Sequence, residues 1–350
     1  MNRLSILCCV VDDTELLLLF LMLFRLCTAN VDGPNDTITY TQCLNDDGKM
    51  EADITVCKMT SERFIVIATD TMHRHVETLL RRKLDPTATK HVTVVDVTGA
   101  YAQLNIQGPE SRDLLARLTD SDVSNIGFPF RTAREIGIGY SRLLCARITY
   151  VGELGYELHI PCEHALDVYD RVISAGKEVG LVHAGLKALS SLRMEKAYRD
   201  YGHDMDNLDS LLEVGLGFTA DTSKADGFVG DHHVIAQKLE LKNTKGLRRR
   251  LLQVLLKDPQ QMMFHGEVVW RDGVCVGDIR AASYGHTLGG AVGLCMVEAH
   301  HGQDERASSV VINNDYINSG KWEVEIGNHR YPATVSLAPM YDPKNARIKI

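Results

Sequence analysis

Residues 148–161, ITYVGELGYELHIP, show the pattern of a strand, a tight turn and a second strand. Two glycines mark the turn, and the apolar side chains of Tyr156, Leu158 and Ile160 alternate with polar ones in the second strand. Such alternation places apolar side chains on one face of a strand and polar side chains on the other. The segment therefore predicts a half-buried β-hairpin with a loose, glycine-containing turn.

Two glutamates in this hairpin occupy different positions. Glu153 falls in the turn, where we expect its carboxylate to be solvated. Glu157 lies within the second strand, where a charge needs either water or a partner. From the pattern alone, Glu157 either faces solvent or points into a pocket and binds a group with N–H donors.

Composition and charge indicate an ordinary globular protein. The chain has 350 residues, enough for two or three domains. Its 45% apolar and 24% charged residues are typical of soluble globular proteins. The net charge is −8, and the basic triplet at 248–250 is an isolated one, so we expect no nucleic-acid partner.

The nine cysteines are scattered without any CxxC pair, and their odd number argues against a disulfide framework. We therefore expect a reducing compartment. The adjacent pairs His232–His233 and His300–His301 lack the spacing of a helical metal site, so we expect no metal. The sequence has no Gly-rich dinucleotide fingerprint, Walker loop, GxSxG elbow or HExxH motif.

Residues 15–27 contain an uninterrupted apolar run of nine residues, far shorter than a bilayer span. Acidic residues directly before this run argue against a signal peptide. The sequence therefore predicts no membrane span and argues against a secreted protein.

Regular structure is expected from about residue 37 onward. Residues 37–59 read as two strands around the turn Asn45–Gly48. Helical spacing occurs at 71–84, 110–119, 164–180 and 183–202, and strand patterns dominate from 246 onward. A shift in composition near 225–246 predicts a domain boundary there.

Seven motifs follow one another in a fixed order: LNDDGKMEADITV, NIQGPESRDLL, ITYVGELGYELHIP, AGLKALSSLRMEKAYRDYGHDM, LLEVGLGF, WRDGVCVGDIRAASYG and LAPMYDPKNARI. In this order they resemble the C-terminal, folate-binding half of the sarcosine and dimethylglycine dehydrogenase family. They are also similar to the aminomethyltransferase (T-protein) of the glycine cleavage system and to the regulatory subunit of pyruvate dehydrogenase phosphatase. The resemblance runs from about residue 28 to residue 350.

The resemblance implies an α+β protein with an aminomethyltransferase-like folate-binding fold and a C-terminal β-barrel-like domain, arranged around a central tetrahydrofolate channel. We accordingly expect an atypical apolar N-terminal segment at 1–29. The folate-binding domain is expected at 30–240 and the barrel domain at 241–350.

The resemblance also implies ligand contacts. The folate-binding glutamate of the family lies in the second strand of the hairpin and corresponds to Glu157, whose carboxylate can accept two N–H bonds from the 2-amino-pyrimidine edge of the pterin. Tyr341 matches an aromatic residue beside the ligand, or packs at the end of the barrel. Arg193 either contacts the cofactor or forms a structural ion pair with Glu195 or another carboxylate. Leu189 occupies the position of a cofactor-contacting arginine.

The catalytic aspartate of the family precedes the QGP turn by eight or nine residues, where this chain has Gly99 and Ala100. The nearest acid is Asp96, which either serves as the catalytic acid or is an ordinary carboxylate at a strand edge. The family's amine-transferring reaction uses an acid to orient or deprotonate the folate amine. A chain without that acid would bind folate and transfer poorly.

These features imply two functions. The first is a tetrahydrofolate-binding one-carbon acceptor module of a flavoenzyme of the mitochondrial matrix that oxidises sarcosine or dimethylglycine. Its FAD would come from a flavoprotein domain or subunit that this chain lacks, and we expect either a truncated chain or an incomplete gene model. The second is a non-catalytic regulatory subunit. Glu157 favours the first function, whereas Leu189 and the missing acid at 99–100 favour the second.

Overall fold

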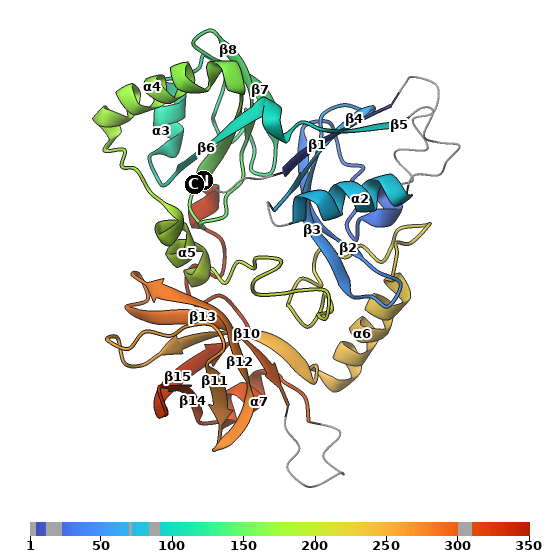
Figure 1. The fold of residues 1–350 in the computed structure, drawn as a ribbon, viewed down its shortest axis with the longest axis vertical. Coiled ribbons are helices and arrows are strands. Elements are labelled where there is room, and N and C mark those ends of the chain that lie inside the picture. Colours follow the sequence, from blue (N-terminus) through green and yellow to red (C-terminus); the bar gives the residue numbers. More distant parts are fainter. Residues whose placement is uncertain (1–4, 12–22, 70–71, 84–91, 300–309) are drawn as a thin grey trace.

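The computed structural model describes residues 5–11, 23–69, 72–83, 92–299 and 310–350. They form two open β-sheets, a closed β-barrel and a connecting segment between the sheets and the barrel (Figure 1). The predicted α+β class with a C-terminal barrel is therefore confirmed. The domain boundaries at 29 and 240 stay predictions, and a helix, α6 (Asp231–Thr244), spans the second of them.

The first sheet has five strands in the order β2-β3-β4-β1-β5. Its strands are β1 (Ser5–Val11), β2 (Thr37–Leu44), β3 (Met50–Lys58), β4 (Arg63–Ala68) and β5 (Val92–Asp96). All neighbouring strands are antiparallel. The predicted hairpin of β2 and β3 is confirmed, and its turn uses a left-handed glycine, Gly48, with a φ of 70°.

Strand β1 corrects the expectation that regular structure starts near residue 37. It lies between β4 and β5 and pairs with both. Leu7 and Cys9 are buried on one face of the sheet and Ile6 on the other. A strand covered on both faces is apolar throughout and shows no alternation, so its sequence did not signal a strand.

The second sheet has four antiparallel strands in the order β6-β9-β8-β7. They are β6 (Tyr101–Gln107), β7 (Ala133–Ile138), β8 (Ser141–Ala146) and β9 (Gly155–Pro161). The predicted hairpin at 148–161 is partly wrong. Its first strand, β8, ends at Ala146, and residues 147–154 form the connection to β9.

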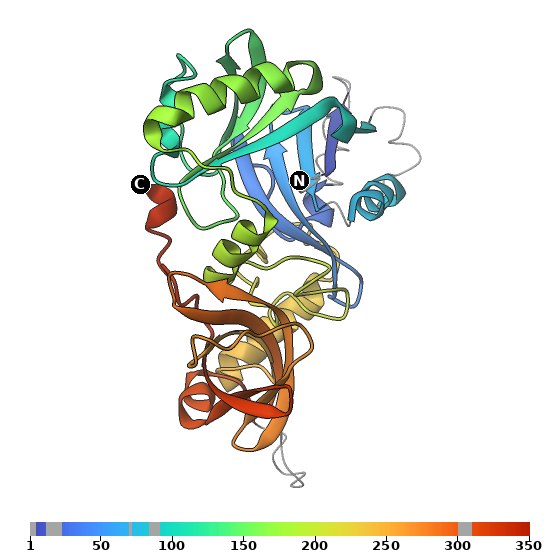
Figure 2. The same cartoon turned by 60° about the vertical axis from the view of Figure 1, so that its left-hand side comes forward.

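The two sheets pack face to face with helices outside them. Helix α2 (His73–Lys83) places Val76 and Leu80 on the outer face of the first sheet. Helices α3 (Ser111–Ala116) and α4 (Ala165–Gly176) cover the outer face of the second sheet. The inner faces of both sheets are therefore buried against each other, so β9 is covered on both sides and not half-buried as predicted (Figures 1 and 2).

Helix α5 (Leu186–Glu195) lies between the sheets and the barrel (Figure 1). It is shorter than the helix predicted at 183–202. Ala197, with a φ of 51°, adopts a left-handed conformation that a helix cannot continue. The chain after α5 then crosses below the sheets as turns before α6 begins.

The C-terminal barrel is closed in the order β10-β13-β12-β11-β14-β15. Its elements are β10 (Arg249–Leu256), β11 (Val268–Arg271), β12 (Val274–Gly285), β13 (Gly290–Glu298), α7 (Asn314–Ser319), β14 (Trp322–Ile326) and β15 (His329–Ser336). After β15 the chain leaves the barrel and returns to the second sheet, where its last residues lie (Figure 2).

Candidate functional site between the sheets

The inner faces of the two open sheets meet over an apolar cluster that includes Ile38, Cys57 and Ile65 from the first sheet and Leu144 and Ala146 from the second. Residues two positions apart in a strand share a face. Polar residues in register with this cluster therefore also point between the sheets. We call this set of polar residues on the inner faces of the sheets the inter-sheet site; it comprises Tyr40, Gln42, Asp53, Asn105, Glu157 and His159.

Three alternate cross-strand pairs of β6 and β9 line the inter-sheet site: Gln103 with His159, Asn105 with Glu157, and Gln107 with Gly155. Gly155 makes room for Gln107, because a Cβ at position 155 would lie 1.8 Å from Gln107 Oε1. Among the described residues, Gln107 Oε1 and both ring nitrogens of His159 are buried and have no hydrogen-bond partner. Buried polar atoms are costly without partners, so this face fits a polar ligand or water that supplies them.

Glu157 lies at the centre of these pairs. Its side chain is only 12% exposed, so it does not face open solvent. Burial raises the pKa of Glu157 to about 7, and burial lowers the pKa of His159 to about 4. His159 Nε2 lies 3.8 Å from Glu157 Oε2. A buried carboxylate in this setting is suited to a ligand that brings N–H donors.

Asp53 is a second buried carboxylate of the inter-sheet site that we did not predict from the sequence. Tyr40 Oη donates to Asp53 Oδ2 at 3.0 Å, and Gln42 Nε2 donates to Asp53 Oδ1 at 2.7 Å. Burial raises the pKa of Asp53 to about 7, although these two hydrogen bonds oppose the shift. An acid inside the alternating strand MEADITV was the available signal, the same kind of signal that drew attention to Glu157.

The segment that follows α5 lies next to Asp53. The rings of Tyr150 and Tyr198 stack with centroids 6.1 Å apart, and Tyr150 Oη donates to the Arg199 carbonyl oxygen at 2.9 Å. Burial raises the pKa of Tyr150, and the charges of Arg193 and Asp53 also act on it. Acidic, basic and aromatic groups from the first sheet and this segment therefore surround one region.

Arg193 is held by the protein itself. Its Nη1 forms an ion pair with the fully buried Asp204 and donates to the Tyr198 carbonyl oxygen at 3.1 Å. The carboxylate of Glu195 instead accepts the backbone N–H groups of Thr287 and Leu288. Arg193 thus forms a structural ion pair with a neighbouring carboxylate, and its contact with a cofactor stays a prediction.

Tyr341 joins the C-terminal segment to the connection between β8 and β9. Its hydroxyl donates to Glu153 Oε1 at 2.9 Å, whereas Glu153 Oε2 is buried without a hydrogen-bond partner among the described residues. The sequence predicted a solvated Glu153 carboxylate, and this prediction is wrong. The fully buried Lys196 donates to the Asp342 carbonyl oxygen at 2.6 Å and to Asn345 Oδ1 at 2.8 Å. Tyr341 as a ligand contact stays a prediction.

Asp96 is exposed at the end of β5, on the edge of the first sheet farthest from β2. Its Oδ1 accepts the backbone N–H of Thr98 at 3.0 Å. The structure does not place Asp96 among the residues of the inter-sheet site, and its catalytic role stays a prediction. Leu189 is partly buried on α5.

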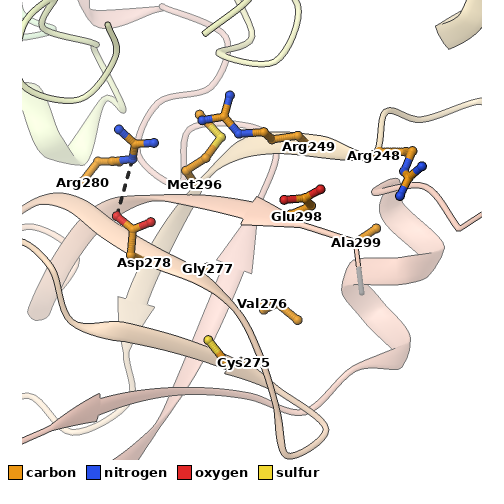
Figure 3. A pocket seen from close by; sticks show the side chains of 10 residues that line it. All are labelled: Arg248, Arg249, Cys275, Val276, Gly277, Asp278, Arg280, Met296, Glu298 and Ala299. Atoms are coloured by element: carbon orange, nitrogen blue, oxygen red, sulfur yellow. Dashed lines mark ion pairs between the residues drawn. The ribbon is translucent and has the colours of Figure 1, made fainter. Parts of the chain in front are cut away.

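A cavity of about 480 Å³ lies on the barrel, and neither Glu157 nor Asp53 lines it (Figure 3). Arg249 pairs with Asp209 at 2.7 Å, and Arg280 pairs with Asp278 at 3.5 Å. Arg249 and Arg280 are thus engaged by carboxylates of the chain. The lining residues of the cavity come from β10, β12 and β13 and the residues next to them, so we regard it as a surface groove of the barrel.

No group of three or more His, Cys, Asp or Glu side chains in the described part of the chain is arranged to hold a metal ion. All nine cysteines are free thiols. Within the residues that the structure places, none of the helices is both long and apolar enough to cross a membrane.

Two family models match the chain. The model described as "GCVT N-terminal domain" matches residues 21–224, and "Glycine cleavage T-protein C-terminal barrel domain" matches residues 249–342. The chain therefore belongs to the glycine cleavage T-protein family of folate-utilising aminomethyltransferase modules. Its fold is similar to that of the aminomethyltransferase T from Bartonella henselae, with a TM-score of 0.75 and 18% identity over 96% of this chain and 84% of that one.

Curated relatives are longer proteins. The chain is 36% identical over 324 residues to the 4-methylaminobutanoate oxidase (formaldehyde-forming) of Paenarthrobacter nicotinovorans, covering 92% of this chain and 36% of that protein. It is 33% identical over 339 residues to the mitochondrial sarcosine dehydrogenase of Mus musculus, covering 92% of this chain and 35% of that protein. It is 30% identical over 316 residues to the mitochondrial pyruvate dehydrogenase phosphatase regulatory subunit of Mus musculus, covering 89% of this chain and 35% of that protein. The chain thus spans about a third of the length of these relatives.

Proposed function

We propose that this chain is the tetrahydrofolate-binding, one-carbon-accepting module of a sarcosine dehydrogenase-like flavoenzyme of the mitochondrial matrix. The observation that carries the proposal is the buried Glu157 beside Gln107 and His159, whose buried polar atoms have no hydrogen-bond partner among the residues that the structure describes. The relatives named as a formaldehyde-forming oxidase and as a sarcosine dehydrogenase support the choice of reaction class. In this proposal FAD is supplied by a flavoprotein domain or subunit outside these residues.

The residues of the inter-sheet site fit a folate. Glu157 would hold the amino-pyrimidine edge of the pterin, because an ionised carboxylate can accept two N–H donors. Tetrahydrofolate, when bound, supplies a nucleophilic nitrogen that takes up a one-carbon unit. The packing of the two sheets keeps bulk water away from Glu157, which strengthens its hydrogen bonds to a ligand.

Asp53 is the proton-handling group of this proposal. Its pKa of about 7 lies near neutral pH, where a carboxyl group can both accept and release a proton at Oδ1 or Oδ2. Tyr40 and Gln42 hold the carboxyl group in one orientation. Asp53 thus offers the acid that Gly99 and Ala100 do not.

The second candidate is a non-catalytic regulatory subunit like the pyruvate dehydrogenase phosphatase relative. Leu189 favours it, because an apolar side chain stands where an arginine was expected to contact the cofactor. The two candidates differ in catalysis and can share folate binding. Catalysis therefore has to be measured separately from affinity.

Equilibrium titration of the chain with tetrahydrofolate under anaerobic conditions tests the binding claim. Glu157→Ala is expected to weaken binding by roughly 2–3 kcal/mol, the scale of a lost charged hydrogen-bond pair. Glu163→Ala, a change at an exposed glutamate next to β9, is the matched control and should leave affinity unchanged. Equal affinity of wild type and Glu157→Ala would remove Glu157 from the ligand site.

A further inference from the structure

His159 is a buried histidine of the inter-sheet site to which the proposed function assigns no role of its own. Its exposed fraction is 1%, and neither Nδ1 nor Nε2 has a hydrogen-bond partner among the described residues. A neutral imidazole carries one N–H donor and one acceptor nitrogen. Leaving both unmet in a buried position costs free energy, so a hydrogen-bond partner for the ring stabilises the protein.

Among the described neighbours of His159 on β6, β8 and β9, one polar group with an acceptor to offer lies near it. Across β8 it faces Leu144, which is apolar, and across β6 it faces Gln103, whose Nε2 already donates to Asn105 at 3.1 Å. On its own strand, Glu157 points to the same face, with Nε2 and Oε2 3.8 Å apart. A hydrogen bond would need these two atoms to approach by about 0.8 Å, which a small side-chain rotation provides.

We propose that His159 is a positioning residue for Glu157: its imidazole donates Nε2–H to the Glu157 carboxylate when a ligand with N–H donors is bound. The proposal rests on the proposed function and deepens it. The ligand and His159 then share the lone pairs of one carboxylate, so Glu157 is fixed in one rotamer and one charge state. No bond is made or broken, and the proton stays on the imidazole.

The other titratable groups near Glu157 carry no charge that would set its protonation state, so the hydrogen bond from His159 determines it. The titratable groups near it are His159 and the thiols of Cys57, which shares the space between the sheets, and Cys145, which lies on the opposite face of β8. Burial raises the pKa of both thiols and lowers that of His159, so all three are neutral at pH 7. Donation from His159 stabilises the ionised form of Glu157, which is the form that accepts N–H groups from a ligand.

Two substitutions separate this role from packing. His159→Phe keeps an aromatic ring and removes the donor, whereas His159→Gln keeps a donor of similar reach. The dissociation constant of 5-formyltetrahydrofolate, a stable reduced folate, is measured for each variant between pH 6 and pH 9. Affinity of the wild-type chain should rise with pH and level off above about pH 7, as Glu157 loses its proton.

His159→Phe should weaken binding about tenfold at pH 8, the scale of one hydrogen bond to a charged group. The pH at which affinity levels off should stay the same in every variant, because the pKa of Glu157 in the free protein sets it and the hydrogen bond forms only with the ligand bound. His159→Gln should restore most of the affinity. A purely structural histidine would change the unfolding midpoint of the protein and leave the Phe and Gln variants with equal affinities. Equal affinities of His159→Phe and wild type, or of His159→Phe and His159→Gln, therefore overturn the proposal.

The failure of this inference is distinguishable from failure of the proposed function. If Glu157→Ala weakens binding while His159→Phe matches wild type at every pH, only the role of His159 is overturned. If the wild-type chain does not bind 5-formyltetrahydrofolate, the proposed function fails and the role of His159 falls with it.

Discussion

Tyr341 donates its hydroxyl hydrogen to Glu153 at 2.9 Å, although 188 residues separate the two in the chain. This contact connects the segment after the barrel with the connection that leads into β9. Glu153 lies two residues before Gly155, where the strand that carries Glu157 begins. The segment after the barrel therefore contacts the protein next to the start of that strand.

Tyr341→Phe should lower the free energy of unfolding by about 1 kcal/mol, because Glu153 loses the partner of one oxygen while the other has none within the described part of the chain. Urea denaturation measures the change. Tyr140→Phe, at a tyrosine that is 91% exposed, is the matched control and should be neutral. A neutral Tyr341→Phe would show that the contact contributes nothing to stability.

Lys196→Met should cost about 3 kcal/mol of stability, because it leaves the acceptors of Asp342 and Asn345 without their buried cation. Amide hydrogen exchange should also accelerate over residues 339–350, which Lys196 holds in place. Lys344→Met makes the same change at an exposed lysine of the same segment and should preserve both properties. Slow exchange in Lys196→Met would contradict the proposed anchoring role.

Glu157→Gln should stabilise the protein at high pH. The pKa of Glu157 is raised in the folded state, so the folded protein binds an extra proton between about pH 4.5 and pH 7 and its stability falls as pH rises through that window. The variant should be more stable than wild type by about 3 kcal/mol at pH 8 and equal to it near pH 4. Denaturant titrations at both values test this, with Glu163→Gln as control. A difference that does not depend on pH would contradict the raised pKa.

Asp53→Asn should separate binding from chemistry. If Asp53 handles the proton, the variant should bind tetrahydrofolate within about threefold of wild type and lose about 10–100-fold in the catalysed part of the condensation of formaldehyde with tetrahydrofolate. The rate is measured spectrophotometrically and corrected for the uncatalysed reaction. A wild-type chain without any rate above that background would instead favour the regulatory subunit.

Local patterns predicted much of the fold. The hairpin around Gly48 and helices α2, α4 and α5 follow turn chemistry and helical spacing, which are read from neighbouring residues. Strand β1 was missed and the exposure of β9 misjudged for one reason: both depend on the packing of one sheet against another. That packing is a long-range property that alternation within a strand does not encode.

The candidate site was predicted in part. Glu157 was singled out because a charge inside an alternating strand needs a partner, and the same argument applies to Asp53 in β3, where it was not made. The search for an acid near residues 99–100 followed a spacing from the family resemblance and led to Asp96, which is exposed at the end of β5. His159 gave no signal of its own, since its lack of partners is visible only once β6 and β8 flank it.

The most direct test of the central claim is a crystal structure of the chain with 5-formyltetrahydrofolate. The account predicts that the amino-pyrimidine edge lies against the Glu157 carboxylate between the two sheets. A ligand bound elsewhere, for example in the barrel cavity beside Arg249 and Arg280, with the inter-sheet site unchanged, would contradict it.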